Sequence, residues 1–172
     1  MHSSMSLASR AARPAEAVTD EVWSYALDVN ARGTMYTNQA AFPHLRVGGG
    51  GIVNFASSTG VHGMVDGGHY AASKGAVLAW ARSIAKEWGR HGIRANAVTP
   101  VISTPMYKTY RARLAPEALA EHDAEIARRI PLGGKFGDPD IDMAPVIVFL
   151  VSDASRFITG QTLAVDGGWL IP

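Results

Sequence analysis

Three short apolar runs, separated by stretches with helical periodicity, limit most strongly what this chain can fold into. The runs are GIVNFAS at 51–57, IRANAVT at 93–99 and QTLAVDG at 161–167. The first is apolar and β-branched, as strands buried on both faces are. Strands that alternate with helices form a parallel sheet covered on both faces. The pattern therefore predicts an α/β domain with a parallel sheet.

The helical patterns between these runs organise the rest of the chain. The predicted helices are 19–45, 69–88, 105–114, 116–130 and 140–152. Thr19 is a candidate N-cap for the first of them. The connection after the second strand is long, so we interpret 101–137 as a lid or pocket wall. We expect residues 1–18 to be a flexible lead-in and 19–172 to be one domain.

Composition excludes several classes of partner. The formal net charge is +1, with basic and acidic residues mixed along the chain, so no basic stripe indicates nucleic acid. The longest strongly apolar run, 145–151, is far shorter than the roughly 20 residues that cross a bilayer. No cysteine is present and the histidines show no H-E-x-x-H spacing, so no metal site is predicted. Lack of cysteine suits a reducing compartment, and we predict a cytoplasmic protein.

Tyr70 and Lys74 are the first candidate catalytic residues. A spacing of four places them on one face of the predicted helix, where the ammonium can stabilise a phenolate. An unperturbed phenol has a pKa near 10, and lowering this pKa to about 7 takes roughly 4 kcal/mol of preference for phenolate. The alternative is an exposed tyrosine beside a solvated lysine.

Two further polar residues precede that helix. Ser57 ends the first predicted strand, and parallel-sheet sites form where strands meet the following loops and helices. Asn30 lies inside the first predicted helix, three residues before Gly33, where its amide can replace a broken backbone bond and hold a water. Each could instead be an ordinary serine at a strand end or a solvated asparagine.

Asn30, Ser57, Tyr70 and Lys74 together resemble the catalytic tetrad of the short-chain dehydrogenase/reductase family in residue type, order and spacing. The surrounding segments VNFASSTG, YAASKGAV, IRANAVTP, STPM and FITGQTLAVDGG are similar to that family's characteristic segments. The resemblance covers residues 15–170 and implies part of a Rossmann-type three-layer fold. It also implies an NAD- or NADP-dependent oxidoreductase that interconverts a secondary alcohol and a ketone by hydride transfer, and a homo-oligomer (dimer or tetramer).

The resemblance implies a role for each residue of the tetrad. Tyr70 would exchange a proton with the substrate oxygen, and Ser57 would hold that oxygen. Lys74 would lower the pKa of the tyrosine and bind the nicotinamide ribose. Asn30 would support a water in a proton relay.

The same resemblance implies that the segment after the second strand contacts the nicotinamide, and the residues concerned are Pro100, Ile102 and Thr104. The sequence departs here from the family's pattern. Val101 stands where a glycine usually follows the proline, and the segment is one residue shorter than the family's. Around Met106, Tyr107 and Tyr110, apolar and aromatic side chains could line a substrate pocket or serve ordinary packing.

A larger departure concerns the front of the family's domain. No G-x-G-x-x-G follows a strand in this sequence, so no phosphate-binding turn is predicted. We interpret the chain as the C-terminal two-thirds of such an oxidoreductase. Binding of NAD or NADP by the chain alone is then expected to be weak, and 51–57 would lie at an apolar sheet edge.

Two alternatives compete with an active reductase. One is a catalytically inactive, truncated relative that acts as an oligomerisation partner, for which the smooth stripe of Ala71, Gly75 and Ala79 offers a contact face. The other is a serine hydrolase in which Ser58 of ASSTG is the nucleophile. The hydrolase is disfavoured because a glycine-rich loop is predicted where a nucleophile elbow leads directly into a helix, and no acid and histidine stand out as partners.

Overall fold

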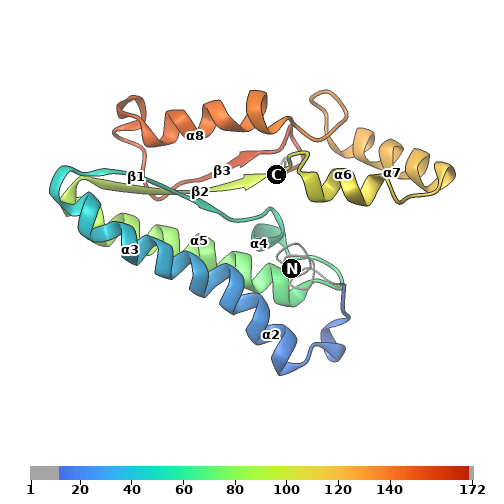
Figure 1. Ribbon diagram of the computed structural model, residues 1–172, viewed down its shortest axis with the longest axis horizontal. Coiled ribbons are helices and arrows are strands. Elements are labelled where there is room, and N and C mark those ends of the chain that lie inside the picture. The colour runs from blue at the N-terminus through green and yellow to red at the C-terminus, as the bar shows by residue number, and fades with distance from the viewer. Residues whose placement is uncertain (1–11, 171–172) are drawn as a thin grey trace.

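The computed structural model describes residues 12–170 and contains a three-stranded parallel sheet (Figure 1). The strands are β1 (Gly50–Phe55), β2 (Ile93–Pro100) and β3 (Thr162–Val165), in the order β1-β2-β3. Gly50 lies opposite Ile93, and Ala97 lies opposite Thr162. The predicted parallel α/β fold is confirmed. The first strand ends at Phe55, so Ser57 lies two residues beyond it and not at its last position.

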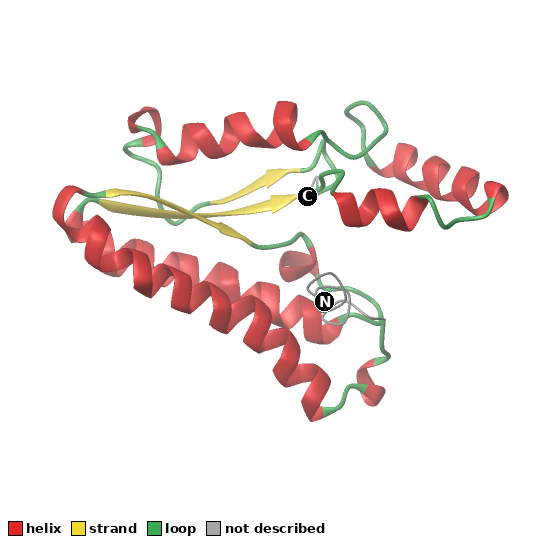
Figure 2. Ribbon diagram, in the orientation of Figure 1, coloured by secondary structure: helices red, strands yellow, loops and turns green. Residues whose placement is uncertain are grey.

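Helices cover both faces of this sheet (Figure 2). On one side lie α3 (Gly33–Gly48) and α5 (Gly68–Trp88), and on the other lies α8 (Ala144–Val151). One core cluster, which includes Ile52, Ile84 and Ile93, joins the sheet to α5. A second, formed by Val98, Met143 and Leu150, joins the sheet to the α8 side. These clusters account for the three layers.

The first predicted helix is continuous but changes its winding in the middle. It comprises α2 (Asp20–Leu27), a π-helical turn η2 (Asp28–Arg32) and α3. The Thr19 side chain accepts a hydrogen bond from the Val22 amide at 3.4 Å, which confirms the expected cap. A π-turn holds one residue more than an α-turn and often marks a functional position. Asn30 lies within it.

Before α5 the structure corrects one expectation. The stretch after Ser58 was predicted to be a loop, but α4 (Thr59–His62) begins directly after Ser58. A Cβ on Gly60 would lie 2.7 Å from the backbone of Lys74, so this short helix packs closely against α5 at a position that only glycine can occupy. This contact also covers the Gly75 part of the small-residue stripe from within the same chain.

The other short elements lie around the sheet. They are η1 (Ala15–Ala17), η3 (Gly89–His91), η4 (Pro139–Met143) and η5 (Asp153–Ser155). Of the predicted lead-in, residues 1–11 lie outside the described residues. In the remainder, the Arg13 amide donates a hydrogen bond to the Asp66 carbonyl.

Two helices lie in the segment 101–137, beside the ends of β2 and β3, and the lid interpretation of this segment stays a prediction. They are α6 (Pro105–Arg111) and α7 (Pro116–Arg129), and Figure 1 shows them extending away from the sheet. No helix in residues 12–170 is long and apolar enough to cross a membrane.

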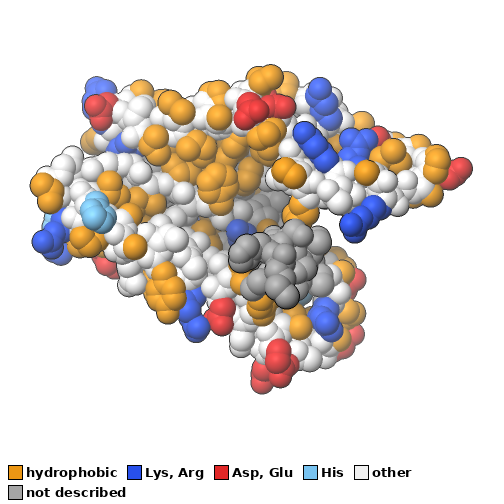
Figure 3. Space-filling model, in the orientation of Figure 1, with side chains coloured by type: hydrophobic (Ala, Val, Ile, Leu, Met, Phe, Trp, Pro, Cys, Tyr) orange, Lys and Arg blue, Asp and Glu red, His pale blue; other side chains and the backbone are white. Residues whose placement is uncertain are grey.

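Within residues 12–170, β1 is an edge strand, as expected. Figure 3 shows hydrophobic side chains gathered in a hollow beneath α8. Several apolar residues on and near α8 are exposed, including Val148 at 64% and Val151 at 45%. This face of the sheet is therefore only partly covered.

Candidate active site

Tyr70 and Lys74 lie in the first two turns of α5, beside the end of β1. Tyr70 is buried, with 8% of its surface exposed. The Lys74 ammonium donates a hydrogen bond of 2.9 Å to the Phe55 carbonyl and lies 6.0 Å from the centre of the Tyr70 ring. The bond to the last residue of β1 fixes the lysine side chain, so its charge stays close to the tyrosine.

Ser57 lies two residues after that carbonyl and is half-buried. Its Oγ accepts hydrogen bonds from the Thr59 amide at 3.3 Å and the Thr59 hydroxyl at 3.0 Å. Both bonds use oxygen lone pairs, so the Ser57 proton can still be donated. The local turn thus orients Ser57 as a hydrogen-bond donor.

Asn30 is joined to α5 by one hydrogen bond, to Ser73, which in turn bonds to the Tyr70 backbone. Its side-chain amide donates to the Ser73 hydroxyl at 3.0 Å, and that hydroxyl donates to the Tyr70 carbonyl at 2.7 Å. Ser73 is fully buried. The asparagine therefore contacts the Tyr70 backbone through Ser73.

Sequence reasoning did not single out Ser73, although it lies between Tyr70 and Lys74 in the quoted segment YAASKGAV. Its position at i+3 from Tyr70 places its hydroxyl within reach of the Tyr70 carbonyl, a bond common for serine in helices. The second partner, Asn30, is distant in the sequence. That pairing leaves no local pattern.

Pro100, Ile102 and Thr104 follow one another away from the end of β2. Pro100 is the last residue of the strand and lies opposite Val165, and Ile102 pairs with Gly137. The Thr104 hydroxyl caps α6 by accepting a bond of 3.2 Å from the Tyr107 amide. The segment 100–104 is thus held at Pro100 by strand pairing and at Thr104 by the cap of α6.

Val101 takes part in the same extended pairing. Its amide donates to the Val165 carbonyl at 2.9 Å, and its carbonyl accepts from the Gly137 amide at 3.1 Å. Val101 has no positive φ, so the backbone here does not require the glycine that the family usually has. The substitution is therefore compatible with the local structure.

Because the three strands are parallel, their carboxyl ends lie at one edge of the sheet. Phe55, Pro100 and Val165 mark that edge, and the Phe55 carbonyl binds Lys74 there. Ligands of open α/β sheets bind outside this edge. The candidate site therefore lies where such a sheet offers a crevice.

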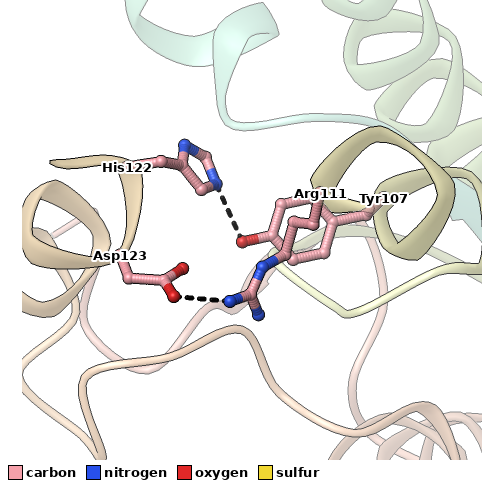
Figure 4. Close-up of polar contacts among 4 residues, drawn as sticks. All are labelled: Tyr107, Arg111, His122 and Asp123. Carbon is pink, nitrogen blue, oxygen red and sulfur yellow. Dashed lines mark hydrogen bonds and ion pairs between the residues drawn. The ribbon is translucent and has the colours of Figure 1, made fainter. Parts of the chain in front are cut away.

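A second group of polar side chains lies between α6 and α7 (Figure 4). The Tyr107 hydroxyl and His122 Nε2 share a hydrogen bond of 3.0 Å, and Arg111 forms an ion pair with Asp123. Burial raises the pKa of Tyr107 from its ordinary value, and the nearby Arg111 charge opposes that rise. The Tyr107 ring stacks on Phe136 with ring centres 4.1 Å apart.

Residues 12–170 contain no group of three or more histidine, aspartate or glutamate side chains placed to hold a metal ion.

Comparison with known proteins places these features in context. A family model described as enoyl-(acyl carrier protein) reductase matches residues 1–170. The chain is 38% identical over 154 residues to the 3-oxoacyl-[acyl-carrier-protein] reductase of Thermotoga maritima, covering 88% of this chain and 58% of that protein. It is equally similar, at 38% over 154 residues, to the (3R)-3-hydroxyacyl-CoA dehydrogenase of Rattus norvegicus, covering 88% of this chain and 56% of that protein.

The chain is also similar to solved structures of dehydrogenases and oxidoreductases. Carveol dehydrogenase from Mycobacterium avium in complex with NAD has a TM-score of 0.83 and 32% identity, covering 94% of this chain and 61% of that one. An oxidoreductase of the short chain dehydrogenase/reductase family from Burkholderia thailandensis has a TM-score of 0.79 and 33% identity, with the same two coverages. The chain thus spans less than two thirds of the length of each of these four proteins.

Proposed function

This chain belongs to the short-chain dehydrogenase/reductase family, and from that membership we propose that it is an NAD(P)-dependent oxidoreductase that interconverts a secondary alcohol and a ketone by hydride transfer. One observation carries the proposal. Lys74, held by the Phe55 carbonyl at the carboxyl edge of a parallel sheet, lies 6.0 Å from the ring centre of the buried Tyr70. A phenol beside a fixed ammonium can act as an acid and a base.

Tyr70 is the proposed proton donor and acceptor. In the reductive direction its hydroxyl gives a proton to the carbonyl oxygen, and in the oxidative direction its phenolate takes a proton from the alcohol. Lys74 favours the phenolate electrostatically. Ser57 donates a hydrogen bond to the same substrate oxygen and so fixes its position. NAD or NADP, when bound, supplies or accepts the hydride.

Asn30 has a proposed double role. Its amide nitrogen binds Ser73 and thereby positions the backbone of Tyr70. Its side-chain oxygen can accept a bond from a water, as a proton relay to solvent requires. The π-turn presents Asn30 for both roles because it widens the helix at this residue.

The residues present fit one half of a nicotinamide cofactor. Lys74 and Tyr70 would hold the nicotinamide ribose, and Pro100, Ile102 and Thr104 would contact the nicotinamide amide. The sequence offers no G-x-G-x-x-G turn for the pyrophosphate. We therefore propose that this chain by itself binds NAD or NADP weakly.

The substrate is proposed to be a small alcohol or ketone, with 101–137 as the lid over it. Relatives carry names as different as 2-dehydro-3-deoxy-D-gluconate 5-dehydrogenase and 4-formylbenzenesulfonate dehydrogenase. These names agree on oxidation or reduction and differ in the substrate. They favour the enzyme over an inactive oligomerisation partner, and family membership disfavours the serine hydrolase. A cytoplasmic location and a homo-oligomeric state remain predictions.

The direct test combines cofactor binding with turnover. The 172-residue chain is titrated with NADH and NADPH while nicotinamide fluorescence is followed, and cofactor oxidation is then measured with a panel of small ketones. We expect Tyr70→Phe to lower turnover about 100- to 10,000-fold, because the ring remains while the proton donor is lost.

Tyr36→Phe is the matched control, since Tyr36 is 58% exposed on α3 and its loss of a hydroxyl should leave turnover unchanged. Equal turnover of Tyr70→Phe and the wild type would contradict the proposed role of Tyr70. Absence of both binding and turnover would contradict activity of this chain.

A further inference from the structure

A cavity of about 420 Å³ lies between the lid helices α6 and α7 and the loop that follows them. Its wall includes the aromatic Tyr107 and Phe136, the charged Arg111, Asp123 and Lys135, and the apolar Ile126 and Ala127. None of the four proposed tetrad residues lines it. The cavity lies within the proposed lid segment 101–137, and the proton-transfer chemistry of the tetrad does not itself use it.

The polar part of the wall carries an excess of positive charge. Arg111 binds Asp123 through one terminal nitrogen, at 2.5 Å. The Nε of Arg111 is buried and has no hydrogen-bond partner among the described residues. Lys135 is exposed and forms no ion pair with any residue of the described part of the chain. Two cations thus face one carboxylate.

An unpaired buried donor on a charged group is costly, because it has lost its water without gaining an acceptor. An anion in the cavity would supply an acceptor to Arg111 and a counter-charge to Lys135. Carboxylates and phosphates both suit a guanidinium edge. The polar wall therefore favours an anionic ligand.

The remaining wall is apolar. Phe136 stacks on Tyr107 with the rings 17° from parallel, and Ile126 and Ala127 of α7 lie on the same cavity. The Phe136 ring is itself held edge-on by Trp169 at 6.3 Å. A ligand with only charged oxygens would leave this surface unused, whereas an apolar body would cover it.

We propose that this cavity binds a small organic acid, with its carboxylate at Arg111 and Lys135 and its apolar body against Phe136. A neighbouring hollow of about 370 Å³ offers a contrast within the same helix pair. It is lined by residues of α7 alone, and two carboxylates, Glu121 and Glu125, outnumber the one arginine, Arg128, so the balance of charge opposes an anion. Of these two cavities in residues 12–170, the one at Arg111 has the charge that the proposal requires.

Isothermal titration of the full chain with benzoate tests the proposal, because benzoate joins a carboxylate to a flat apolar ring. Benzyl alcohol has the same ring without the charge, and inorganic phosphate has the charge without the ring. We expect measurable binding of benzoate and at least about tenfold weaker binding of benzyl alcohol, which lacks the charged hydrogen bonds, and of phosphate, which lacks the apolar ring. Equal binding of phosphate or benzyl alcohol would overturn the assignment of ligand class.

Three variants locate the binding. Arg111→Gln removes the charge, and Ala127→Phe fills the cavity while leaving Arg111 and Asp123 in place. Both should weaken benzoate binding at least about tenfold. Arg46→Gln removes an arginine from the last turn of α3 and should bind benzoate as the wild type does.

Circular dichroism identifies folded variants, so the test does not depend on Arg111→Gln remaining folded. Undiminished binding by folded Ala127→Phe, or no binding of benzoate by the wild type, would overturn the proposal. Benzoate binding is measured without NAD(P) and without turnover. A lack of benzoate binding would therefore not contradict the proposed oxidoreductase function. A lack of turnover would likewise not contradict the proposed binding of an organic acid.

Discussion

At the scale of single residues, His69 has the least satisfied surroundings in the described part of the chain. It is 1% exposed, lies beside Tyr70 in the first turn of α5, and neither ring nitrogen has a hydrogen-bond partner among the described residues. Burying polar groups without partners costs free energy. His69 therefore lowers the stability of the fold at the helix that carries Tyr70 and Lys74.

Replacing the His69 side chain by an apolar one of similar size is predicted to stabilise the fold. His69→Leu should raise the free energy of unfolding by about 1 kcal/mol, because the desolvation cost disappears. Urea denaturation followed by circular dichroism measures the change. His69→Gln, which keeps buried polar atoms, is the control and should give no such gain. A lower stability of His69→Leu than of the wild type would contradict the prediction.

Tyr107 leads to a prediction about pH. Burial raises the pKa of Tyr107, so the folded protein holds this proton more tightly than the unfolded chain, whose tyrosine pKa is near 10. The stability contributed by this difference is complete below pH 10 and is lost as pH rises through the folded pKa.

Tyr107→Phe should consequently show a smaller loss of stability than the wild type between about pH 9 and 11. Thermal unfolding at a series of pH values measures it. Tyr110→Phe serves as the control, because Tyr110 is 51% exposed and lies on the same helix. Parallel curves for Tyr107→Phe and the wild type would contradict the inference.

At the scale of elements, Arg94 joins a strand to the end of a helix. From β2 its guanidinium donates to the carbonyls of Leu150, Val151 and Ser152 and to the Ser155 hydroxyl. These carbonyls lie at the C-terminus of α8, where the helix has no further amides to satisfy them and where positive charge is favourable. Arg94 thus holds α8 against the sheet.

Arg94→Met keeps most of the aliphatic chain and removes the donors. We expect the free energy of unfolding to fall by about 3 kcal/mol, since several charge-assisted bonds are lost together. Guanidinium titration of the variant provides the measurement. Lys86→Met on the exposed side of α5 should cost far less. A similar loss in both variants would mean that the contact with α8 contributes little.

The elements differ in how far the sequence could predict them. The sequence predicted the ends of the three strands to within two residues, because a short apolar run bounded by glycine or proline is typical of a buried strand. The helix α4 could not be predicted from the sequence, because its TGVH begins a glycine-rich stretch that is typical of a loop. Its helical form depends on Gly60 packing against the Lys74 backbone, which is a tertiary contact.

In the candidate site, too, local sequence patterns predict some features, while others depend on tertiary contacts. Tyr70, Lys74 and Ser57 stand in short recognisable segments, so the sequence singles them out, and their catalytic roles remain proposals. The bond from Asn30 to Ser73 and the pairs between α6 and α7 join residues distant along the chain. Such pairs follow from the fold and not from any local period.

At the scale of the whole molecule, the sheet presents an incompletely covered face. β1 is at the edge of the described sheet, and α8 carries the exposed Val148 and Val151 one turn apart. Exposed strand edges and apolar patches favour association. The fold itself therefore favours contact with another chain, and the homo-oligomer stays a prediction.

Charging this patch is predicted to reduce association. The chain should show a mass above 18.3 kDa by light scattering as its concentration rises, and Val148→Lys with Val151→Lys should lower both this mass and the binding of a hydrophobic dye. Val47→Lys is the control, since Val47 is 88% exposed on α3. A monomer at every concentration would contradict the prediction.

The parallel pairing also determines the order in which the molecule can assemble. Gly50 pairs with Ile93, and Ala97 pairs with Thr162, so every ladder of the sheet connects residues far apart along the chain. Closing such long loops delays the first stabilising contacts and slows folding. During synthesis, β2 must leave the ribosome and wait for more than sixty further residues before its second neighbour exists. During that interval the edge of β2 that later pairs with β3 is unpaired, which favours non-native association.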